Sequence, residues 1–173
     1  TRTRILRLRR NPFSISAIEP AGRNAVRLKI EPPAGRTFRY LPGQFGFITP
    51  LSSALTQEEH PFTIASTPTR PEALEFIIRA SGDWTKRLDR LRAGDRVLVD
   101  GPFGRFSYLR QPATSEIVLI AGGIGITPML SILNSVLERG IGREIWLYYG
   151  IRNGSEHIMK AHLRTLADRH DNF

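Results

Sequence analysis

The spacing of apolar and polar residues divides the chain into two parts, which meet near residue 113. In the first part, short stretches alternate apolar and polar residues with a period of two, as half-buried strands do. Joints that contain Pro and Gly separate these stretches. Six strands at this spacing favour a small antiparallel β-barrel, and we predict them at residues 12–19, 25–31, 44–49, 60–66, 73–80 and 96–101.

One amphipathic helix is predicted between the last two strands of this barrel. Trp84, Leu88 and Leu91 recur at helical spacing, and Gly94 ends the pattern. The first predicted domain therefore covers residues 1–112 and consists of the six-stranded barrel and a preceding arm.

The second part, residues 113–173, has the pattern of an α/β domain. Two continuous apolar runs predict strands of a parallel sheet with both faces buried, and an amphipathic helix follows each run. The strands are predicted at residues 116–123 and 144–152, and the helices at residues 128–140 and 157–170. A mononucleotide-binding half has a third strand, so we predict a Rossmann-like domain that is truncated. The fold class is therefore mixed, a barrel followed by an α/β domain.

Composition narrows the possible chemistry. The 173 residues include no cysteine, which excludes disulfides, thiolate metal sites and thiol catalysis within this sequence. No apolar run approaches the ~18 residues of a membrane-spanning helix. His157, His162 and His170 lack the spacing of a metal site, and no metal is predicted. Glu58 and Glu59 are adjacent in an extended segment, and we expect them to be solvated charges.

The net charge of +9 is concentrated in the opening segment, TRTRILRLRR. Its arginines are Arg2, Arg4, Arg7, Arg9 and Arg10. A solvated arm explains this charge, and so does a segment that lies against an anionic membrane surface. Nucleic acid is not predicted as a partner, because no basic stripe interleaved with aromatic residues follows. The predicted location is the cytoplasmic face of a membrane, or the cytoplasm.

A glycine-rich stretch, AGGIGITP at residues 121–128, joins the first parallel strand to its helix. Glycines at such a turn let backbone N–H groups and a helix start approach a pyrophosphate. The stretch is not the G-x-G-x-x-G motif, because Pro128 stands third when Gly123 and Gly125 are taken as its first two glycines. A tight turn alone could use these glycines, but the strand before and the helix after favour a nucleotide site.

Two shorter stretches in the barrel carry polar groups at element boundaries. In GDWT, residues 82–85, the helix start and the nearby Arg79 predict a second anion site, although an ordinary capped helix explains the same residues. In HPFT, residues 60–63, Pro61 confines the segment to a strand start or an edge. A capped edge strand explains that stretch when it is considered alone.

The stretches LPGQF, HPFTIAS, IRASGDWT, DGPFG and AGGIGITPML follow one another in the chain. In this order they resemble the ferredoxin–NADP reductase superfamily, and most of all the cytosolic dehydrogenase portion of NADPH oxidases and ferric reductases. The resemblance covers essentially residues 11–170. His60, Pro61, Phe62 and Thr63 stand where the wider superfamily has its Arg-x-Tyr-Ser flavin motif.

The resemblance implies FAD on the barrel and NAD(P)H, with NADPH favoured, on the α/β domain. It implies that Phe62 stacks beside the flavin, that Thr63 hydrogen-bonds near N5 as the catalytic residue, and that His60 holds the ribityl or phosphate region. The other implied FAD contacts are Pro61, Ile64, Ser66, Arg79, Gly82, Asp83, Trp84 and Thr85. The implied NAD(P)H contacts are Gly122, Gly123, Gly125, Thr127, Pro128, Gly150 and Arg152. DGPFG is expected to be a turn that joins the domains.

The function that the resemblance implies is hydride transfer from NAD(P)H to FAD and then single-electron transfer to an acceptor. That acceptor would be the haem of an upstream membrane domain leading to O₂ or ferric iron, or a redox carrier. One alternative is a soluble ferredoxin- or flavodoxin-type NAD(P)H reductase. Another is a flavin- or nucleotide-binding module without turnover.

The sequence also departs from the family. Oxidase-type sequences often carry a histidine where this chain has Ile77, so fewer phosphate contacts are expected there. The family's Cys-Gly segment and C-terminal aromatic residue, which help to place the nicotinamide, would lie beyond Phe173.

Overall fold

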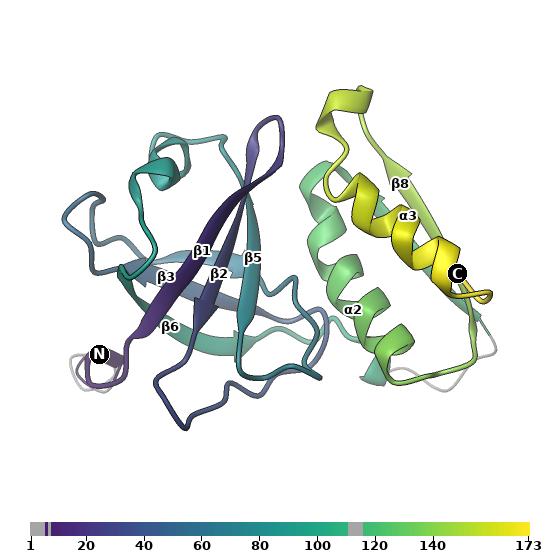
Figure 1. Ribbon diagram of the computed structural model, residues 1–173, viewed down its shortest axis with the longest axis horizontal. Helices are drawn as coiled ribbons and strands as arrows, with labels where there is room; N and C mark the ends of the chain where they lie inside the picture. Colours follow the sequence, from purple (N-terminus) through teal and green to yellow (C-terminus); the bar gives the residue numbers. More distant parts are fainter. Residues whose placement is uncertain (1–5, 7, 111–115) are drawn as a thin grey trace.

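The computed structural model describes residue 6, residues 8–110 and residues 116–173. It contains a β-barrel and an α/β unit that lie side by side (Figure 1). The barrel strands are β1 (Phe13–Gly22), β2 (Ala25–Glu31), β3 (Phe45–Pro50), β4 (His60–Thr63), β5 (Leu74–Arg79) and β6 (Arg96–Phe103). The α/β unit contains β7 (Glu116–Gly122), α2 (Ile126–Glu138), β8 (Glu144–Gly150) and α3 (Lys160–Arg169). Short 3₁₀ helices lie at η1 (Thr85–Arg90), η2 (Tyr108–Arg110), η3 (Gly123–Gly125) and η4 (Gly154–Glu156).

The six strands form one antiparallel sheet in the order β4-β3-β6-β1-β2-β5. Its two edge strands meet just beyond β4, where Ile64 pairs with Phe76 and the Ala65 N–H donates to the Glu75 carbonyl at 2.8 Å. The sheet therefore closes on itself, and closure removes exposed strand edges. The prediction of a six-stranded antiparallel barrel is confirmed, and each predicted stretch overlaps an observed strand.

Alternation along β2 shows why these residues form a barrel wall. Leu28 and Ile30 point into the core and lie opposite Phe76 and Leu74 of β5. Charged residues of β2 alternate with them on the other face. Since side chains of a strand alternate between faces, this register buries one complete apolar set.

The predicted helix between β5 and β6 is the 3₁₀ helix η1 and spans only six residues. Trp84, Leu88 and Leu91 are buried in the barrel core, as predicted. The helix ends at Arg90 rather than near Gly94, because Leu91 already has extended backbone angles (φ −67°, ψ 154°). The expected longer helix is therefore wrong, although its buried face is right.

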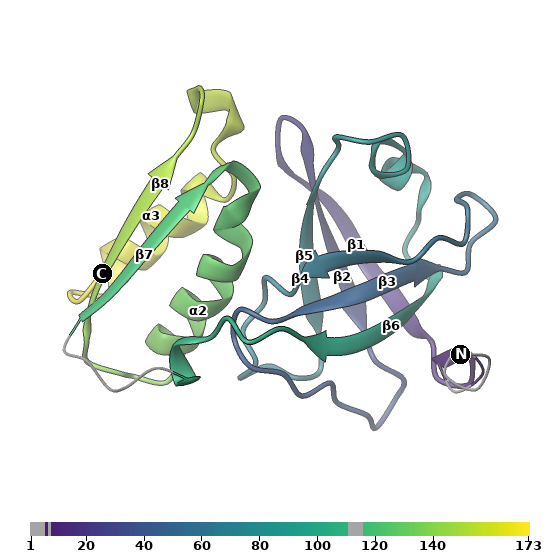
Figure 2. The ribbon, with the colours of Figure 1, turned by 180° about the vertical axis from the view of Figure 1, so that it is seen from behind.

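The α/β unit has the predicted β-α-β-α order, with β7 and β8 parallel. Alternate residues of β7, such as Leu119, pack in a second core with α2 and α3. The opposite face of the sheet exposes Val118, Ile120, Trp146 and Tyr148. Figures 1 and 2 show that both helices lie over the same side of the two strands. The expectation of strands buried on both faces is therefore wrong for the described residues.

A set of contacts that we call the joint connects the barrel to α2. The Ser131 hydroxyl donates to the Ser66 carbonyl at 2.6 Å. Arg70 donates to the Glu138 carboxylate at 2.7 Å, and the Thr69 hydroxyl donates to the same carboxylate. Ile77 of β5 is buried in the second core beside these contacts. The domain boundary predicted between residues 112 and 113 lies outside the described residues.

Candidate functional site

Three aromatic rings from β4 and the start of η1 form a compact group, which we call the aromatic cluster: His60, Phe62 and Trp84. The His60 and Trp84 ring centroids are 4.2 Å apart, and the Phe62 and Trp84 rings are nearly parallel at 6.1 Å. The Trp84 indole N–H donates to the Thr56 carbonyl at 3.2 Å. The structure thus brings together residues that the sequence assigned to separate parts of the flavin site.

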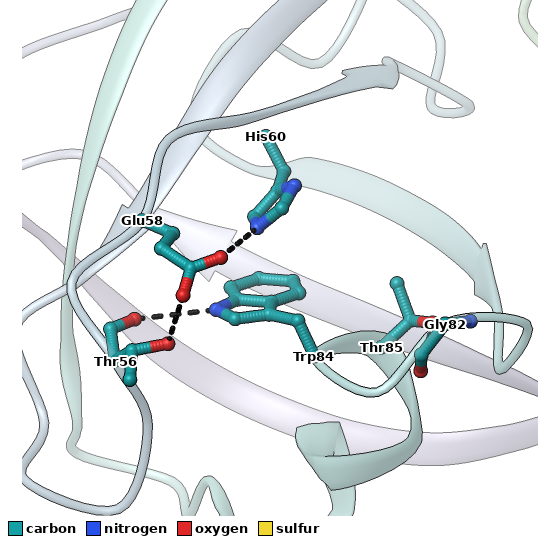
Figure 3. Close-up of polar contacts among 6 residues, drawn as sticks. All are labelled: Thr56, Glu58, His60, Gly82, Trp84 and Thr85. Atoms are coloured by element: carbon teal, nitrogen blue, oxygen red, sulfur yellow. Dashed lines mark hydrogen bonds and ion pairs between the residues drawn. The ribbon is translucent and has the colours of Figure 1, made fainter.

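Glu58 belongs to this cluster, as Figure 3 shows. Its carboxylate accepts a hydrogen bond from the Thr56 hydroxyl at 2.7 Å and lies 3.2 Å from Nε2 of His60. The hydrogen bond from Thr56, and then that from His60, lower the pKa of Glu58. Glu58 is exposed, as expected of a solvated charge, and the structure adds these two contacts, which were not anticipated from the sequence. Period-two spacing could have revealed the contact with His60, because residues 58 and 60 of an extended segment share a face.

The rest of the β4 motif has mixed exposure. Pro61 is exposed, while Phe62 and Thr63 are half-buried, so these three residues border solvent. Ile64 is fully buried in the barrel core, and its N–H donates to the Gln44 carbonyl at 3.0 Å. The Ile64 side chain therefore does not line a ligand surface, contrary to the expectation that it contacts FAD.

The GDWT turn is organised by the hydroxyl of Thr85. This oxygen accepts from the N–H groups of Ser81 at 3.0 Å and Gly82 at 2.9 Å, and it donates to the Gly82 carbonyl at 3.0 Å. Gly82 and Asp83 are exposed beside it. The hydroxyl of Thr85 thus holds the turn in shape through hydrogen bonds within the turn. Gly82 and Asp83 are the residues of the turn that face solvent.

Ser66 lies at the joint rather than in the aromatic cluster. Its hydroxyl accepts from the Glu75 N–H at 3.0 Å and lies 2.8 Å from the Tyr40 hydroxyl. Burial raises the pKa of Tyr40, so this phenol stays protonated. The Ser66 side chain is thus committed to internal contacts.

Arg79 at the end of β5 lies in a cleft with residues of the α/β unit. This glycine cleft, of about 480 Å³, is lined by Arg79, Gly122, Gly123, Ile124, Gly150, Ile151, Arg152 and Glu156. The residue predicted for the FAD pyrophosphate therefore meets four residues that were predicted for NAD(P)H. Arg79 also lies 3.7 Å from the carboxylate of Glu156.

Gly123 is the residue of the cleft that most requires glycine. Its φ is +51°, and an added Cβ would lie 3.2 Å from the guanidinium of Arg79. A Cβ at Gly122 or Gly125 would meet nothing within 4 Å, so the backbone there is open. The turn can therefore present bare backbone to a ligand, which is the property that a pyrophosphate site needs.

Two side chains outside the glycine cleft stabilise the glycine turn by hydrogen bonds to its carbonyl groups. Thr127 is buried and donates its hydroxyl to the Ile124 carbonyl at 3.1 Å, and Pro128 is half-buried in the first turn of α2. Tyr149 of β8 donates its hydroxyl to the Gly123 carbonyl at 3.0 Å, and burial raises its pKa. No sequence pattern pointed to Tyr149, because this contact depends on the pairing of β7 with β8.

The remaining histidines do not gather. His162 lies 3.1 Å from the amide oxygen of Asn134, and burial lowers its pKa. Within the described part of the chain, no group of three or more His, Cys, Asp or Glu residues is placed to hold a metal ion.

None of the helices in the described residues has both the length and the apolar character that a membrane-spanning helix needs. Of the opening arginines, only Arg9 and Arg10 are described, and Arg9 donates to Gln57 at 3.0 Å.

A cavity of about 620 Å³ lies between β2, β5 and the helices α2 and α3. Of the predicted site residues it contains only Ser66. Its lining mixes arginine, lysine and glutamate, so it has no single charge preference. The predicted chemistry thus lies elsewhere, in the aromatic cluster and the glycine cleft.

Comparison with known families agrees with this division. Residues 10–107 match the family described as FAD-binding domain, and residues 119–173 match the oxidoreductase NAD-binding domain. The chain belongs to the ferredoxin–NADP reductase superfamily. As a member of this superfamily it has FAD and NAD(P)H as its cofactors.

Individual proteins show the same relationship. The chain is 32% identical to the reductase component of propane 2-monooxygenase from Gordonia sp. (strain TY-5), over 92% of this chain and 46% of that protein. It is 30% identical to the NAD(P)H-flavin reductase of Aliivibrio fischeri, over 92% of this chain and 68% of that protein. The chain thus spans about half the length of the first of these relatives.

Solved structures share the fold. The FAD/NAD-binding domain of nitric oxide dioxygenase from Vibrio cholerae O1 biovar El Tor superimposes with a TM-score of 0.81. The match covers 93% of this chain and 70% of that one at 20% identity. The arrangement of barrel and α/β unit is therefore that of a known superfamily fold.

Proposed function

We propose that this chain is the cofactor-binding part of an FAD-dependent NAD(P)H oxidoreductase that passes electrons to a separate redox partner. One observation carries the proposal: Arg79 of the barrel lies against Gly123 of the nucleotide-binding turn. The two predicted cofactor sites therefore adjoin one another. When bound, FAD would supply the chemistry of accepting a hydride and releasing electrons singly.

The residues present fit an FAD on the barrel. The aromatic cluster offers flat apolar surface with Phe62 half-buried, and the half-buried Thr63 follows on the same strand. The guanidinium of Arg79 suits phosphate oxygens, and we keep Gly82 and Asp83, which are exposed on the following turn, as proposed neighbours of these oxygens. We assign Phe62 to orienting the flavin ring and Thr63 to hydrogen bonding at its edge.

The residues of the glycine cleft fit NAD(P)H. The open backbone at Gly122 in the cleft, and at Gly125 in the adjoining turn, gives a pyrophosphate room for close approach. Arg152 lies in the same cleft just beyond β8, where a cation suits a nucleotide phosphate. This supports the predicted preference for NADPH over NADH, which stays a prediction.

The relatives favour a redox-carrier or oxygenase partner over a membrane haem domain. The first of them is the reductase component of a monooxygenase, and another reduces flavin with NAD(P)H. We therefore prefer the alternative of a ferredoxin-type NAD(P)H reductase to the oxidase or ferric reductase reading of the HPFT and GDWT motifs. The membrane contact of the opening arginines and the cytoplasmic location stay predictions.

A spectroscopic experiment tests the proposed function. The 173-residue chain, purified with FAD, should show flavin absorbance that bleaches when NADPH or NADH is added without oxygen, though slowly, because its α/β domain is predicted to be truncated. Bleaching separates a reductase from a flavin-binding module without turnover. A chain that binds no FAD, or that binds it and keeps its colour with both nucleotides, would contradict the proposal.

Arg79→Ala locates the anion contact within this scheme. Loss of a charge-assisted hydrogen bond should weaken FAD by roughly 1.5–3 kcal/mol. Titration of the apoprotein with FAD measures this change. Unaltered FAD affinity with weaker NAD(P)H binding would assign Arg79 to the glycine cleft alone.

A further inference from the structure

The hydrogen bonds around His60 determine which of its ring nitrogens carries a proton. Glu58 has a lowered pKa and is ionised at neutral pH, so its carboxylate only accepts hydrogen bonds. Nε2 of His60 lies 3.2 Å from this carboxylate and must therefore carry the hydrogen. Nδ1 is then the ring nitrogen that remains for another partner.

The imidazole is also restrained by packing. Its ring lies against Trp84 with centroids 4.2 Å apart and 41° between the planes. Trp84 is buried, and its indole N–H is bonded to the Thr56 carbonyl. Rotation of His60 about its ring torsion would lose the carboxylate contact and disturb the packing on Trp84.

Thr56 closes the arrangement into a circuit, of which Figure 3 shows the contacts His60–Glu58, Glu58–Thr56 and Thr56–Trp84 as dashed lines. The Thr56 hydroxyl holds Glu58, the Thr56 carbonyl holds Trp84, and both Glu58 and Trp84 hold His60. Glu58 has no part in the family motif HPFT, because it precedes that motif in the chain. The circuit therefore adds a residue that the motif does not contain.

We propose that Glu58 is a positioning residue of the flavin site, which fixes the tautomer and orientation of His60 so that Nδ1 is presented to the cofactor. The inference rests on the proposed function, since it takes FAD as the ligand that His60 meets. In this tautomer His60 accepts a hydrogen bond at Nδ1, so its complement is a hydroxyl donor such as those of the ribityl chain. Second groups that orient a histidine in this way are common where its tautomer matters.

The first experiment reads the tautomer directly and needs no cofactor. Ring-nitrogen NMR of ¹⁵N-histidine-labelled protein should show His60 with hydrogen on Nε2 in the native chain. In Glu58→Ala the two tautomers should become mixed, and Glu58→Asp should retain part of the native preference. His60→Ala identifies the resonances, and circular dichroism checks that each variant folds.

The second experiment measures the consequence for FAD. Glu58→Ala should weaken FAD about fivefold to tenfold, and this loss should vanish when His60→Ala is already present, because Glu58 acts through His60. Glu59→Ala is the matched control: it removes the neighbouring carboxylate, which lines a separate hollow with Phe47 and Gln57. It should leave the His60 tautomer and FAD affinity unchanged.

The outcomes separate this inference from the proposed function. An unchanged His60 tautomer in Glu58→Ala, or an FAD loss that persists undiminished in the His60→Ala background, would overturn the inference. The same FAD loss in Glu59→Ala would also overturn it, because a general charge effect would then suffice. Failure of the native chain to bind FAD would contradict the proposed function and the assigned ligand, whereas the tautomer readout would still decide whether Glu58 positions His60.

Discussion

The aromatic cluster and the glycine cleft differ in what forms their surfaces: side chains in the cluster, and backbone without side chains in the cleft. In the cluster, side chains make the surface: Trp84 supports His60, and Glu58 supports it from the side. In the cleft, the absence of side chains makes the surface, and Gly123 leaves room for the guanidinium of Arg79. The first should therefore be sensitive to removing atoms, and the second to adding them.

The largest effect is expected where the cluster loses its support. Trp84→Ala removes a ring that is 8% exposed, and deleting a buried Trp typically costs about 3–5 kcal/mol of folding free energy. FAD affinity should fall with it, because His60 and Phe62 lose the ring beside them. Denaturant unfolding and FAD titration measure the two losses.

Trp146→Ala is the matched control for this variant. Trp146 is 52% exposed on β8, and surface substitutions usually stay within about 0.5 kcal/mol. If both variants lost the same stability, the cluster would not have the supporting role that we assign to Trp84.

A smaller but more selective effect is expected from adding one methyl group to the cleft. Gly123→Ala places a Cβ 3.2 Å from Arg79 at a φ of +51°, and a non-glycine residue in such a conformation costs about 1–3 kcal/mol. Binding of NAD(P)H should weaken because the turn and Arg79 must shift. Equilibrium titration and thermal unfolding test this.

Gly142→Ala is the control for the added methyl group, since a Cβ there would meet nothing within 4 Å. Equal nucleotide affinities in the two alanine variants would show that the cleft tolerates side chains. The contrast with the aromatic cluster would then fail.

The joint connects the barrel to α2, and it should influence hydride transfer from NAD(P)H to the flavin more than the binding of either cofactor. Glu138→Gln weakens the ion pair with Arg70, whose side chain is 68% exposed, so stability should change by only about 0.2–1 kcal/mol. We expect a lower rate of flavin reduction by NAD(P)H with FAD affinity unchanged, because α2 would be held less firmly against the barrel. Stopped-flow reduction measures the rate, and a changed FAD affinity at a normal rate would contradict this role.

The smallest effect concerns pH. Burial lowers the pKa of His162 from 6.5, and Glu75, Arg27 and Glu138 are the charged groups that act on it. A depressed pKa means that the unfolded chain takes up a proton first, so the stability due to neutral His162 is complete above 6.5 and declines as pH falls below it. His162→Gln should therefore lose less melting temperature than the native chain between pH 7 and pH 5. The opposite ordering would show that His162 is protonated in the folded state.

Local patterns in the sequence predicted the parts of the fold that depend on neighbouring residues. Period-two alternation located all six barrel strands, and the buried face of η1 followed from the spacing of Trp84, Leu88 and Leu91. The type of that helix did not follow, because its short span is set by the connection between β5 and β6. The exposed face of β7 and β8 was also missed, since a continuous apolar run does not reveal whether one or both faces of a strand are covered by other elements.

The candidate site shows the same limit. The HPFTIAS and AGGIGITP stretches were each assigned as a whole to a cofactor site, but in the structure their residues have different roles. Ile64 is buried in the barrel core, and Thr127 donates a hydrogen bond to the Ile124 carbonyl within the glycine turn. The meeting of Arg79 with Gly123, and of Tyr149 with the Gly123 carbonyl, joins segments that are distant in the chain. The first contact arises from the packing of the barrel on the α/β unit and the second from the pairing of β7 with β8, and spacing along one strand cannot reveal either.

The placement of the two tryptophans gives the chain two optical reporters with different surroundings. Trp84 is enclosed beside His60 and Phe62, whereas Trp146 is open to solvent on the far sheet. A collisional quencher such as acrylamide should therefore extinguish the emission of Trp146 first and leave a shielded, blue-shifted component from Trp84. Energy transfer from the shielded Trp84 emission to a flavin would report binding of the cofactor to the barrel. In the same sample, the quenchable Trp146 emission would report changes in the α/β unit.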